Sequence, residues 1–196
     1  MALPSRAATL VDVARPQAKP ITSDVLLVIA FGALMGLLAQ ISIPLPFTPV
    51  PVTGQTFGVI VTGALLGSRR GAAAMAVYVA EGAAGLPVFA LARGGWEVLA
   101  GPTGGYLLAF PAAAFAVGLL AERGWDRRFA TAIAALLLGE LIIYAGGLCW
   151  LARFVAPARV IPLGLVPFLP GDALKVLAAA ALLPAGWRTI HRVPRT

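Results

Sequence analysis

The chain contains only one cysteine and one histidine in 196 residues, and charged residues make up only 12% of it. The lone Cys149 excludes an internal disulfide, and together with the lone His191 it excludes a conventional histidine and cysteine metal cluster. The sequence has no P-loop for nucleotide binding and no serine or cysteine nucleophile paired with histidine. These absences predict a protein that is not an enzyme and that needs no cofactor of its own.

Apolar residues dominate the rest of the composition: they make up 60% of the chain, and the mean hydropathy is +0.91. Such values are typical of a protein that lies within a lipid bilayer. A bilayer core of about 30 Å needs roughly 17 to 25 apolar residues per helix. We therefore predict an all-α integral membrane protein with six transmembrane helices, over residues 24–43, 52–68, 71–91, 103–122, 129–155 and 169–187.

Two short segments flank this transmembrane domain, which we place at residues 24–190. Residues 1–23 carry three basic residues and three prolines, and they lack the continuous apolar run of a signal peptide. We expect them to form a disordered cytoplasmic tail. Residues 191–196 are expected to form a short basic tail on the same side.

The positive charges are divided unevenly between the two sides, and Lys and Arg are retained on the cytoplasmic side of a membrane. Only Arg93, Arg153 and Arg159 fall in one set of loops, and Lys175 lies within a span. The other eleven of the fifteen basic residues fall on the opposite side: Arg6, Arg15, Lys19, Arg69, Arg70, Arg123, Arg127, Arg128, Arg188, Arg192 and Arg195. This predicts a multi-pass protein of the cell membrane with both termini in the cytoplasm. Because these charges are scattered over short loops, no nucleic-acid partner is expected.

The outward connections are rich in proline and glycine and poor in charge. Residues 41–55 hold four prolines and no charged residue, and residues 82–106 hold seven glycines together with Trp96 and Tyr106. Proline stiffens a loop, glycine allows close backbone approach, and irregular backbone at membrane depth is tolerated where it lines a cavity. These segments are interpreted as walls of a pocket that opens outward. The alternative is that they are plain connectors in which proline ends a helix.

Asp172 and Lys175 lie three residues apart at the start of the last apolar segment. Ionisable groups within a membrane segment are costly and usually face a cavity or each other. At this spacing both side chains share one helix face. The pair predicts a site for a small solute with both hydrogen-bond donors and acceptors. The alternative is a satisfied salt bridge at a helix start.

Glu81 and Glu140 also interrupt apolar helices. In a proton-coupled carrier, such carboxylates change protonation and bias a conformational change. Alternatively, they hydrogen-bond to neighbouring helices while protonated. We interpret Glu140 as a packing residue and retain Glu81 as a pocket candidate.

Four segments together resemble one known family. They are residues 48–55 (TPVPVTGQ), 85–90 (GLPVFA), 101–106 (GPTGGY) and 167–175 (PFLPGDALK). In this combination the chain resembles the BioY family, the biotin-binding S components of energy-coupling factor (ECF) transporters, over nearly all residues beyond the N-terminal tail. The resemblance implies an S-component-like six-helix bundle that binds biotin from outside. It also implies delivery inward with a transmembrane coupling protein and two ATP-binding subunits as partners.

Biotin would give the predicted site residues defined roles. Its ureido group has two N–H donors and a carbonyl acceptor, so Asp172 could accept from the N–H groups and Lys175 could donate to a carbonyl or pair with the carboxylate. Which end of biotin each residue contacts stays open. The further candidates for substrate binding are Gln55, Glu81, Phe89, Arg93, Trp96, Gly101, Thr103 and Tyr106. For Phe89, Trp96 and Tyr106 the alternative is an aromatic belt at the membrane interface.

The first helix carries small residues at Gly32 and Gly36. Small residues four apart allow close helix approach. In the family that the chain resembles, a small-residue motif of the first helix docks onto the coupling protein, which makes Gly32 and Gly36 candidates for partner docking. The alternative is packing within the chain's own bundle.

A self-sufficient secondary transporter of a small vitamin is the alternative function. Such carriers usually show internal repeats or broken helices at matching positions in two halves, and the sequence shows no convincing repeat. Membrane lipid is the expected surrounding. Whether the chain forms a homo-oligomer stays open.

Overall fold

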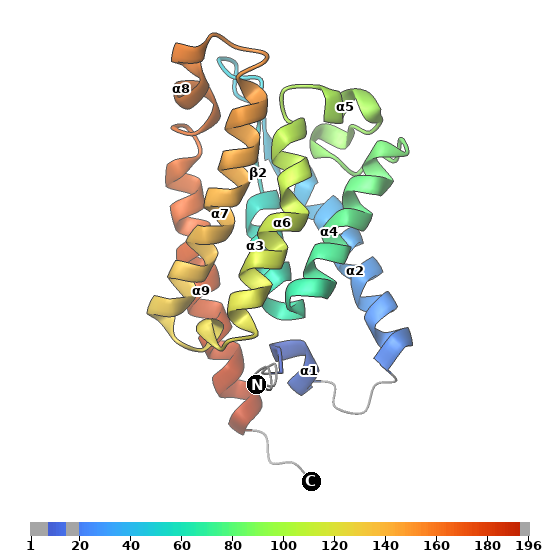
Figure 1. Cartoon of the computed structure of the whole chain (residues 1–196), viewed down its shortest axis with the longest axis vertical. Helices are drawn as coiled ribbons and strands as arrows, with labels where there is room; N and C mark the ends of the chain where they lie inside the picture. Colours follow the sequence, from blue (N-terminus) through green and yellow to red (C-terminus); the bar gives the residue numbers. More distant parts are fainter. Residues whose placement is uncertain (1–7, 15–19, 193–196) are drawn as a thin grey trace, which may run out of the picture.

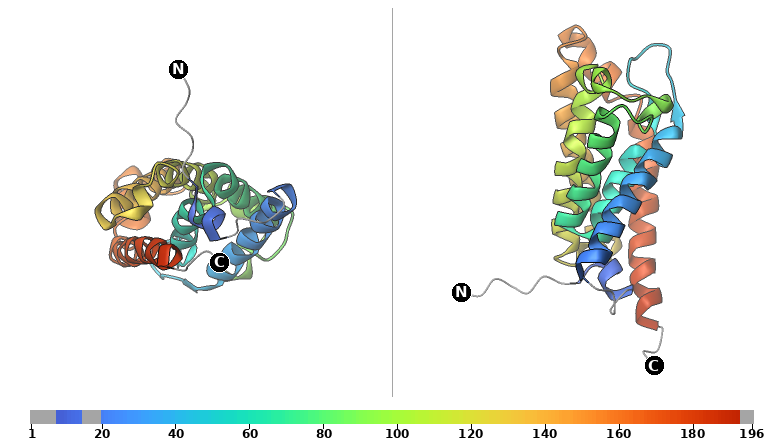
Figure 2. Two further views of the ribbon diagram at one scale, coloured as in Figure 1. Left: turned by 90° about the horizontal axis from the view of Figure 1, so that it is seen from below. Right: turned by 90° about the vertical axis from the view of Figure 1, so that its right-hand side faces the viewer.

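Six helices of 12 to 24 residues form a bundle in the computed structural model, which describes residues 8–14 and 20–192 (Figure 1). They are α2 (Pro20–Gln40), α3 (Gln55–Leu66), α4 (Ser68–Ala83), α6 (Gly104–Ala121), α7 (Phe129–Leu151) and α9 (Leu169–Arg192). Their axes run along the long axis of the molecule, and α3 lies in the middle of the bundle (Figures 1 and 2).

The short elements close the two ends of the bundle. One end, here called the pocket end, carries β1 (Ser42–Ile43), β2 (Val52–Thr53), η1 (Ala90–Ala92), α5 (Trp96–Ala100), η3 (Pro157–Arg159) and α8 (Val160–Gly164). The strands β1 and β2 pair antiparallel, with Ser42 opposite Thr53. The other end, here called the α1 end, carries α1 (Leu10–Ala14), η2 (Trp125–Arg127) and the last turns of α9.

In the part of the chain that the structure describes, four helical segments are long and apolar enough to cross a membrane: Thr22–Gln40, Gly104–Ala121, Phe129–Leu151 and Leu169–Ile190. These four candidate spans coincide with the predicted spans over 24–43, 103–122, 129–155 and 169–187, with ends that differ by a few residues. The helices α3 and α4 are shorter, with 12 and 16 residues.

The two short helices end early because their flanking residues adopt other conformations. The predicted span 52–68 begins in β2 rather than in a helix. The predicted span 71–91 stops at Ala83, since Gly85 has a φ of +99° and Pro87 follows it. The apolar residues beyond these helix ends belong to loops of the pocket end instead of to helices.

Small residues allow the helices to pack closely. A Cβ atom at Gly63 of α3 would collide with Ala114 of α6, and one at Gly147 of α7 would collide with the ring of Tyr106. Close approach through glycine and alanine is the usual means of helix association where lipid supplies no hydrophobic driving force. The positions of α6 and α7 against each other and against α3 are fixed in this way.

Gly32 and Gly36 belong to this internal packing. Both are buried: Gly32 faces Ala74 and Val77 of α4, and Gly36 faces Val88. The exposed residues of α2 are on its other face, for example Leu26 and Leu37. The structure therefore favours the alternative, packing inside the bundle, for these two residues.

Part of the expected N-terminal tail is structured. Residues 8–14 include α1, Thr9 is buried, and α2 already begins at Pro20. The remaining residues of this predicted tail, 1–7 and 15–19, lie outside the described residues. The helix α9 extends to Arg192, so that only 193–196 of the expected C-terminal tail lie outside them.

Candidate ligand-binding pocket

A cavity of about 730 Å³, its open mouth included, lies between α3, α6, α7, α9 and the loops of the pocket end. Its walls are mostly aliphatic and aromatic, with a few polar groups among them. This pattern is typical of a small-molecule site, in which a few polar groups fix the orientation of an apolar ligand. The lining residues are Val50, Pro51, Thr53, Gln55, Thr56, Phe89, Ala90, Leu91, Arg93, Val98, Thr103, Tyr106, Leu107, Phe110, Ile143, Tyr144, Phe168, Asp172 and Lys175.

The predicted pair of Asp172 and Lys175 forms the polar side of this cavity. Lys175 Nζ lies 2.8 Å from Asp172 Oδ1, 2.9 Å from Thr56 Oγ1 and 2.6 Å from the carbonyl oxygen of Thr53. Asp172 Oδ1 also accepts from the Thr56 hydroxyl at 3.0 Å. Both charges are therefore paired and hydrogen-bonded, as buried charges must be.

The start of α9 explains why this pair faces the cavity. The helix begins at Leu169, and the backbone N–H of Asp172 donates to the carbonyl oxygen of Phe168. Proline is tolerated in a first helical turn, where Pro170 stands, and the helix N-terminus favours a carboxylate such as Asp172. One turn later, Lys175 emerges on the same face.

Two tyrosines form the next layer of the site. The hydroxyl of Tyr144 donates to Asp172 Oδ2, and the rings of Tyr144 and Tyr106 meet edge to face with centroids 6.3 Å apart. The hydroxyl of Tyr106 donates to the carbonyl oxygen of Gly164 at 2.9 Å, which ties α8 to α6. The tyrosines therefore connect the charged pair to the covering segment at the pocket end.

The opposite wall is held by Gln55, Tyr78 and Phe89. The side-chain amide of Gln55 donates to Tyr78 Oη at 2.7 Å, and the Tyr78 hydroxyl donates to the carbonyl oxygen of Val88 at 3.1 Å. The Phe89 ring lies against Gly82, where a Cβ atom would collide with it. This packing fixes the ring at the cavity wall.

The rim beside Phe89 is strained. Leu91 and Ala92 have φ angles of +62° and +53°, a region that residues other than glycine rarely adopt. Gln40 holds this segment, because its side-chain amide donates to the Phe89 carbonyl oxygen at 3.2 Å and its carbonyl oxygen accepts from the Ala92 N–H at 3.0 Å. Strained backbone of this kind is found at ligand sites when the surroundings enforce it.

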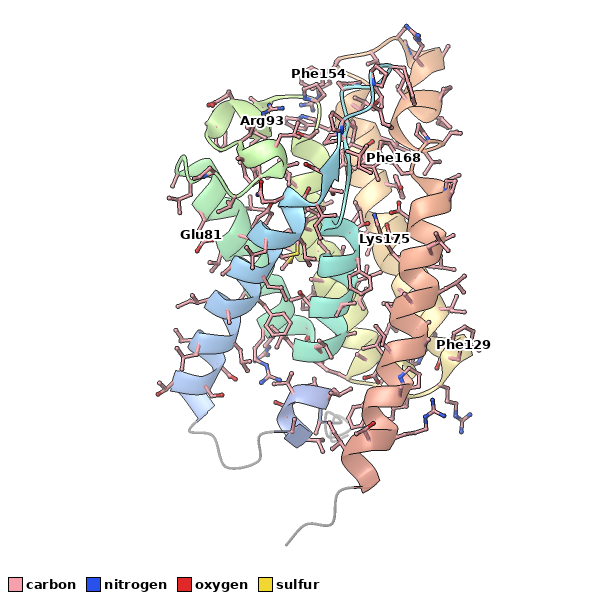
Figure 3. All side chains as sticks on the ribbon, turned by 180° about the vertical axis from the view of Figure 1, so that it is seen from behind. Glu81, Arg93, Phe129, Phe154, Phe168 and Lys175 are labelled. Atoms are coloured by element: carbon pink, nitrogen blue, oxygen red, sulfur yellow. The ribbon has the colours of Figure 1, made fainter. Side chains whose placement is uncertain are left out.

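The structure brings most of the predicted site residues together. Seven line the cavity: Gln55, Phe89, Arg93, Thr103, Tyr106, Asp172 and Lys175. Figure 3 shows Arg93 and Phe168 at the pocket end, Lys175 below them, and Glu81 away from them at the outer side of the bundle.

Three predicted residues do not line the cavity. Trp96 is 69% exposed, Gly101 accepts a hydrogen bond from the Trp150 indole at 2.9 Å, and Glu81 lies outside the lining. Gly101 thus holds α5 and α6 against α7, which is a supporting role.

Sequence reasoning missed four polar or aromatic lining residues: Thr53, Thr56, Tyr144 and Phe168. Thr53, Thr56 and Phe168 lie inside the motifs 48–55 and 167–175 or one residue beyond them, so proximity to those motifs was an available signal. Tyr144 had no such signal, since it lies within a long apolar helix.

A family model and individual relatives both identify the family that the four sequence segments resemble. The BioY family model matches residues 8–192. A biotin transporter BioY of Thermotoga maritima is 46% identical over 153 residues, which cover 78% of this chain and 88% of the relative. A biotin transporter BioY of Rhizobium etli is 37% identical over 172 residues, which cover 82% and 91%.

A solved structure matches the fold as well. It is a crystal structure of the S-component for biotin from an ECF-type ABC transporter, with a TM-score of 0.74 and 26% identity, and the match covers 84% of this chain and 90% of the other. The resemblance carried by the four sequence motifs is thereby confirmed. The chain belongs to the BioY family.

Proposed function

We propose that this protein takes up biotin as the substrate-capture component of an ECF-type transporter. The observation that carries the proposal is a largely buried Asp172–Lys175 pair on one side of a mostly apolar cavity, within a BioY-family fold. Biotin has the complementary chemistry: a ureido group with two donors and one acceptor, an apolar ring and an aliphatic chain. It is bound and moved without chemical change, so the protein is not an enzyme.

The arrangement of the pair favours the ureido group at Asp172. Asp172 is 6% exposed, and Tyr144 and Phe168 line the cavity with it, so a ligand that reaches its carboxylate is largely enclosed. Arg93 is exposed and lies at the rim, where a terminal carboxylate of a bound ligand would remain close to solvent. Phe89, Leu107 and Phe110 offer apolar contact between these two polar regions.

The membrane arrangement that accompanies this function has six crossings with both termini in the cytoplasm. A helix of 12 residues such as α3 spans only about 18 Å. We infer that β2 and the adjoining loop take up the remaining depth, since irregular backbone is tolerated where protein covers it or it lines a cavity. The basic residues of the α1 end, among them Arg69, Arg123 and Arg128, support a cytoplasmic position for that end.

Delivery inward requires partners. The chain has no P-loop, so any coupling to ATP comes from separate subunits. For an S-component these are a transmembrane coupling protein and two ATP-binding subunits, and we propose the same set here.

Calorimetric titration of detergent-purified protein from biotin-starved cells tests the proposal. Biotin is expected to bind without added metal or nucleotide, while thiamine and riboflavin give no binding heat. A folded, ligand-free sample that gives no heat with biotin would contradict the proposed substrate.

A further inference from the structure

Glu140 is a buried acid that the pocket does not use. It lies in the middle of α7 and is 5% exposed, and within residues 8–14 and 20–192 neither of its carboxyl oxygens has a hydrogen-bond partner. An ionised carboxylate without donors is costly to bury, especially at membrane depth. Glu140 therefore fits its present surroundings as a neutral, protonated acid.

The helix geometry places Glu140 level with Lys175. The helices α7 and α9 pack side by side and run in opposite directions, and Tyr144 on α7 meets Asp172 on α9 (Figure 1). At 1.5 Å per residue, Lys175 lies about 4.5 Å beyond Asp172 toward the α1 end, and Glu140 lies about 6 Å beyond Tyr144 in the same direction. Along the bundle axis, Tyr144 and Asp172 therefore lie at one height, and Glu140 and Lys175 lie at a second height, about one helical turn closer to the α1 end.

The hydrogen bonds of Asp172 leave little room for a ligand with two donors. A carboxylate has about four lone-pair positions. Lys175 and Thr56 donate to Oδ1 and Tyr144 donates to Oδ2, so three of these positions are occupied. A ligand that directs two N–H groups at Asp172 must displace at least one present donor.

Lys175 is the donor that can leave most readily. The hydroxyl of Thr56 is on a short side chain and that of Tyr144 is on a rigid ring, so both can move little. The Lys175 ammonium, in contrast, is at the end of a flexible four-carbon chain. Its three N–H donors are all used at present, by Asp172, Thr56 and the Thr53 carbonyl oxygen. A displaced ammonium needs a new hydrogen-bond acceptor, and the carboxyl group of Glu140 lies at the same height in the bundle as Lys175.

We propose that Glu140 is this second acceptor and that it links ligand binding to one proton. When a ligand donates two N–H groups to Asp172, the Lys175 ammonium turns to Glu140, which becomes a carboxylate and releases its proton to solvent. The inference rests on the proposed function, because a cyclic urea such as that of biotin supplies the two donors. Glu140 is thereby a positioning residue for Lys175.

Few other titratable groups face Glu140. Among the described elements packed against α7, α9 brings Asp172 and Lys175 and α6 brings Tyr106, which reaches Tyr144. The helices α3 and α8 contain no charged residue. The charged residues of η2 lie more than ten residues from Glu140 along the chain, about 15 Å or more along the axis of α7.

Calorimetry in two buffers tests the link. Titration of the parent with biotin at neutral pH, in phosphate and in Tris, gives the number of protons released from the difference in heat. We expect about one proton to be released per biotin bound. Over the pH range in which Glu140 is protonated in the free protein and ionised in the complex, the Kd should fall by up to about tenfold for each unit by which the pH rises. Glu140→Gln is expected to release no proton and to bind independently of pH.

A matched control and a second variant keep the outcome decisive. Glu81→Gln removes another helix acid that lies outside the cavity lining, and it should release the same number of protons as the parent. Should Glu140→Gln not fold, Glu140→Leu replaces it, because a buried acid without partners tolerates an apolar side chain of similar size.

The results separate the two proposals. Biotin binding with no proton release, or with release that persists without Glu140, overturns this inference and leaves the proposed function standing. A folded parent that does not bind biotin overturns the proposed function and this inference with it.

Discussion

At the scale of single residues, Asp172 is the centre of the site, because three donors from three helices converge on its carboxylate. Thr56 comes from α3, Tyr144 from α7 and Lys175 from α9 itself. A group held from so many sides is pre-organised for a ligand and loses little freedom on binding. The same convergence makes it sensitive to small chemical changes.

Asp172→Asn should weaken biotin binding strongly. The amide keeps the shape of the side chain but removes the negative charge that accepts the ligand N–H groups and that pairs with Lys175 in the ligand-free protein. Loss of one member of a buried pair costs about 3–5 kcal/mol, which corresponds to a loss of affinity of a hundredfold or more if it falls on the complex. Calorimetric Kd values of the parent and the variant measure the change.

Glu97→Gln is the control for this comparison. It neutralises an exposed acid in α5 at the same end of the molecule, outside the cavity lining, and should leave the Kd unchanged. Thermal unfolding of the ligand-free variants checks that each is folded. An Asp172→Asn protein that binds biotin within about threefold of the parent would refute the assigned role of this carboxylate.

Tyr144 shows what residue-level sequence reasoning could not provide. The pair at 172 and 175 was predictable, because its spacing within one helix is visible in the chain. The contact between Tyr144 and Asp172, which lie 28 residues apart in the sequence, depends on the register between α7 and α9. No local sequence pattern specifies that register, so Tyr144 could be assigned to the site only from the packing of the helices.

At the scale of elements, the long apolar helices α6, α7 and α9 were predictable from hydropathy alone. The ends of α3 and α4 were not, because the proline-rich and glycine-rich segments at 48–54 and 84–95 contain many apolar residues and a single charged one, Arg93. Composition cannot distinguish an apolar wall that protein covers from a helix that lipid covers. The inward direction of Gly32 and Gly36 was open for the same reason, since spacing does not tell which neighbour a helix face meets.

The unexpected element is α1, which is bound to the bundle by charges. Arg70 Nη2 lies 2.7 Å from Asp12 Oδ1, and Arg70 Nη1 lies 3.0 Å from Asp24 Oδ1. Thr9 donates to Asp12 Oδ2 through its N–H and its hydroxyl, at 3.0 and 2.8 Å. Leu10 adds an apolar contact to Gly186 of α9. One arginine therefore connects α1, α2 and α4.

Asp12→Asn is expected to loosen α1. The variant removes the carboxylate that Arg70 and Thr9 share, so amide hydrogen exchange over residues 10–14 should become faster while exchange in α7 stays unchanged. Arg123→Gln is the control, because it alters an exposed basic residue at the same end. Equal protection of residues 10–14 in the parent and Asp12→Asn would contradict this account.

The contact should also be independent of pH near neutrality. Burial opposes ionisation of Asp12, but hydrogen bonds from Thr9 and Arg70 and the Arg70 charge outweigh it, and the pKa of Asp12 is lowered from 3.8. A lowered pKa in the folded state means that the stabilisation is present above the ordinary value and is lost as the pH falls through the lowered one. Exchange over residues 10–14, corrected for its intrinsic pH dependence, should therefore stay constant from about pH 8 to pH 5.

At the scale of the whole molecule, the two ends of the bundle differ in charge and in chemistry. The pocket end combines apolar loops with the mouth of the cavity, whereas the α1 end gathers Arg69, Arg70, Arg123, Arg127 and Arg128. A ligand that enters from outside requires the pocket end to face outward. The distribution of positive charge favours the same orientation. The proposed function and the charge distribution therefore both predict that the pocket end faces outward.

Cysteine accessibility in intact cells tests that orientation. In a Cys149→Ser background, which removes the lone exposed cysteine, Ala156→Cys places a thiol at the pocket end and Arg123→Cys places one at the α1 end. Both positions are exposed, so burial does not limit their reaction. A membrane-impermeant sulfonated maleimide should label Ala156→Cys in whole cells and Arg123→Cys only after the membrane is opened. The reverse pattern would place the cavity mouth in the cytoplasm and refute capture from outside. Labelling of both in whole cells would refute the single crossing by α7 that separates the two positions in the bundle.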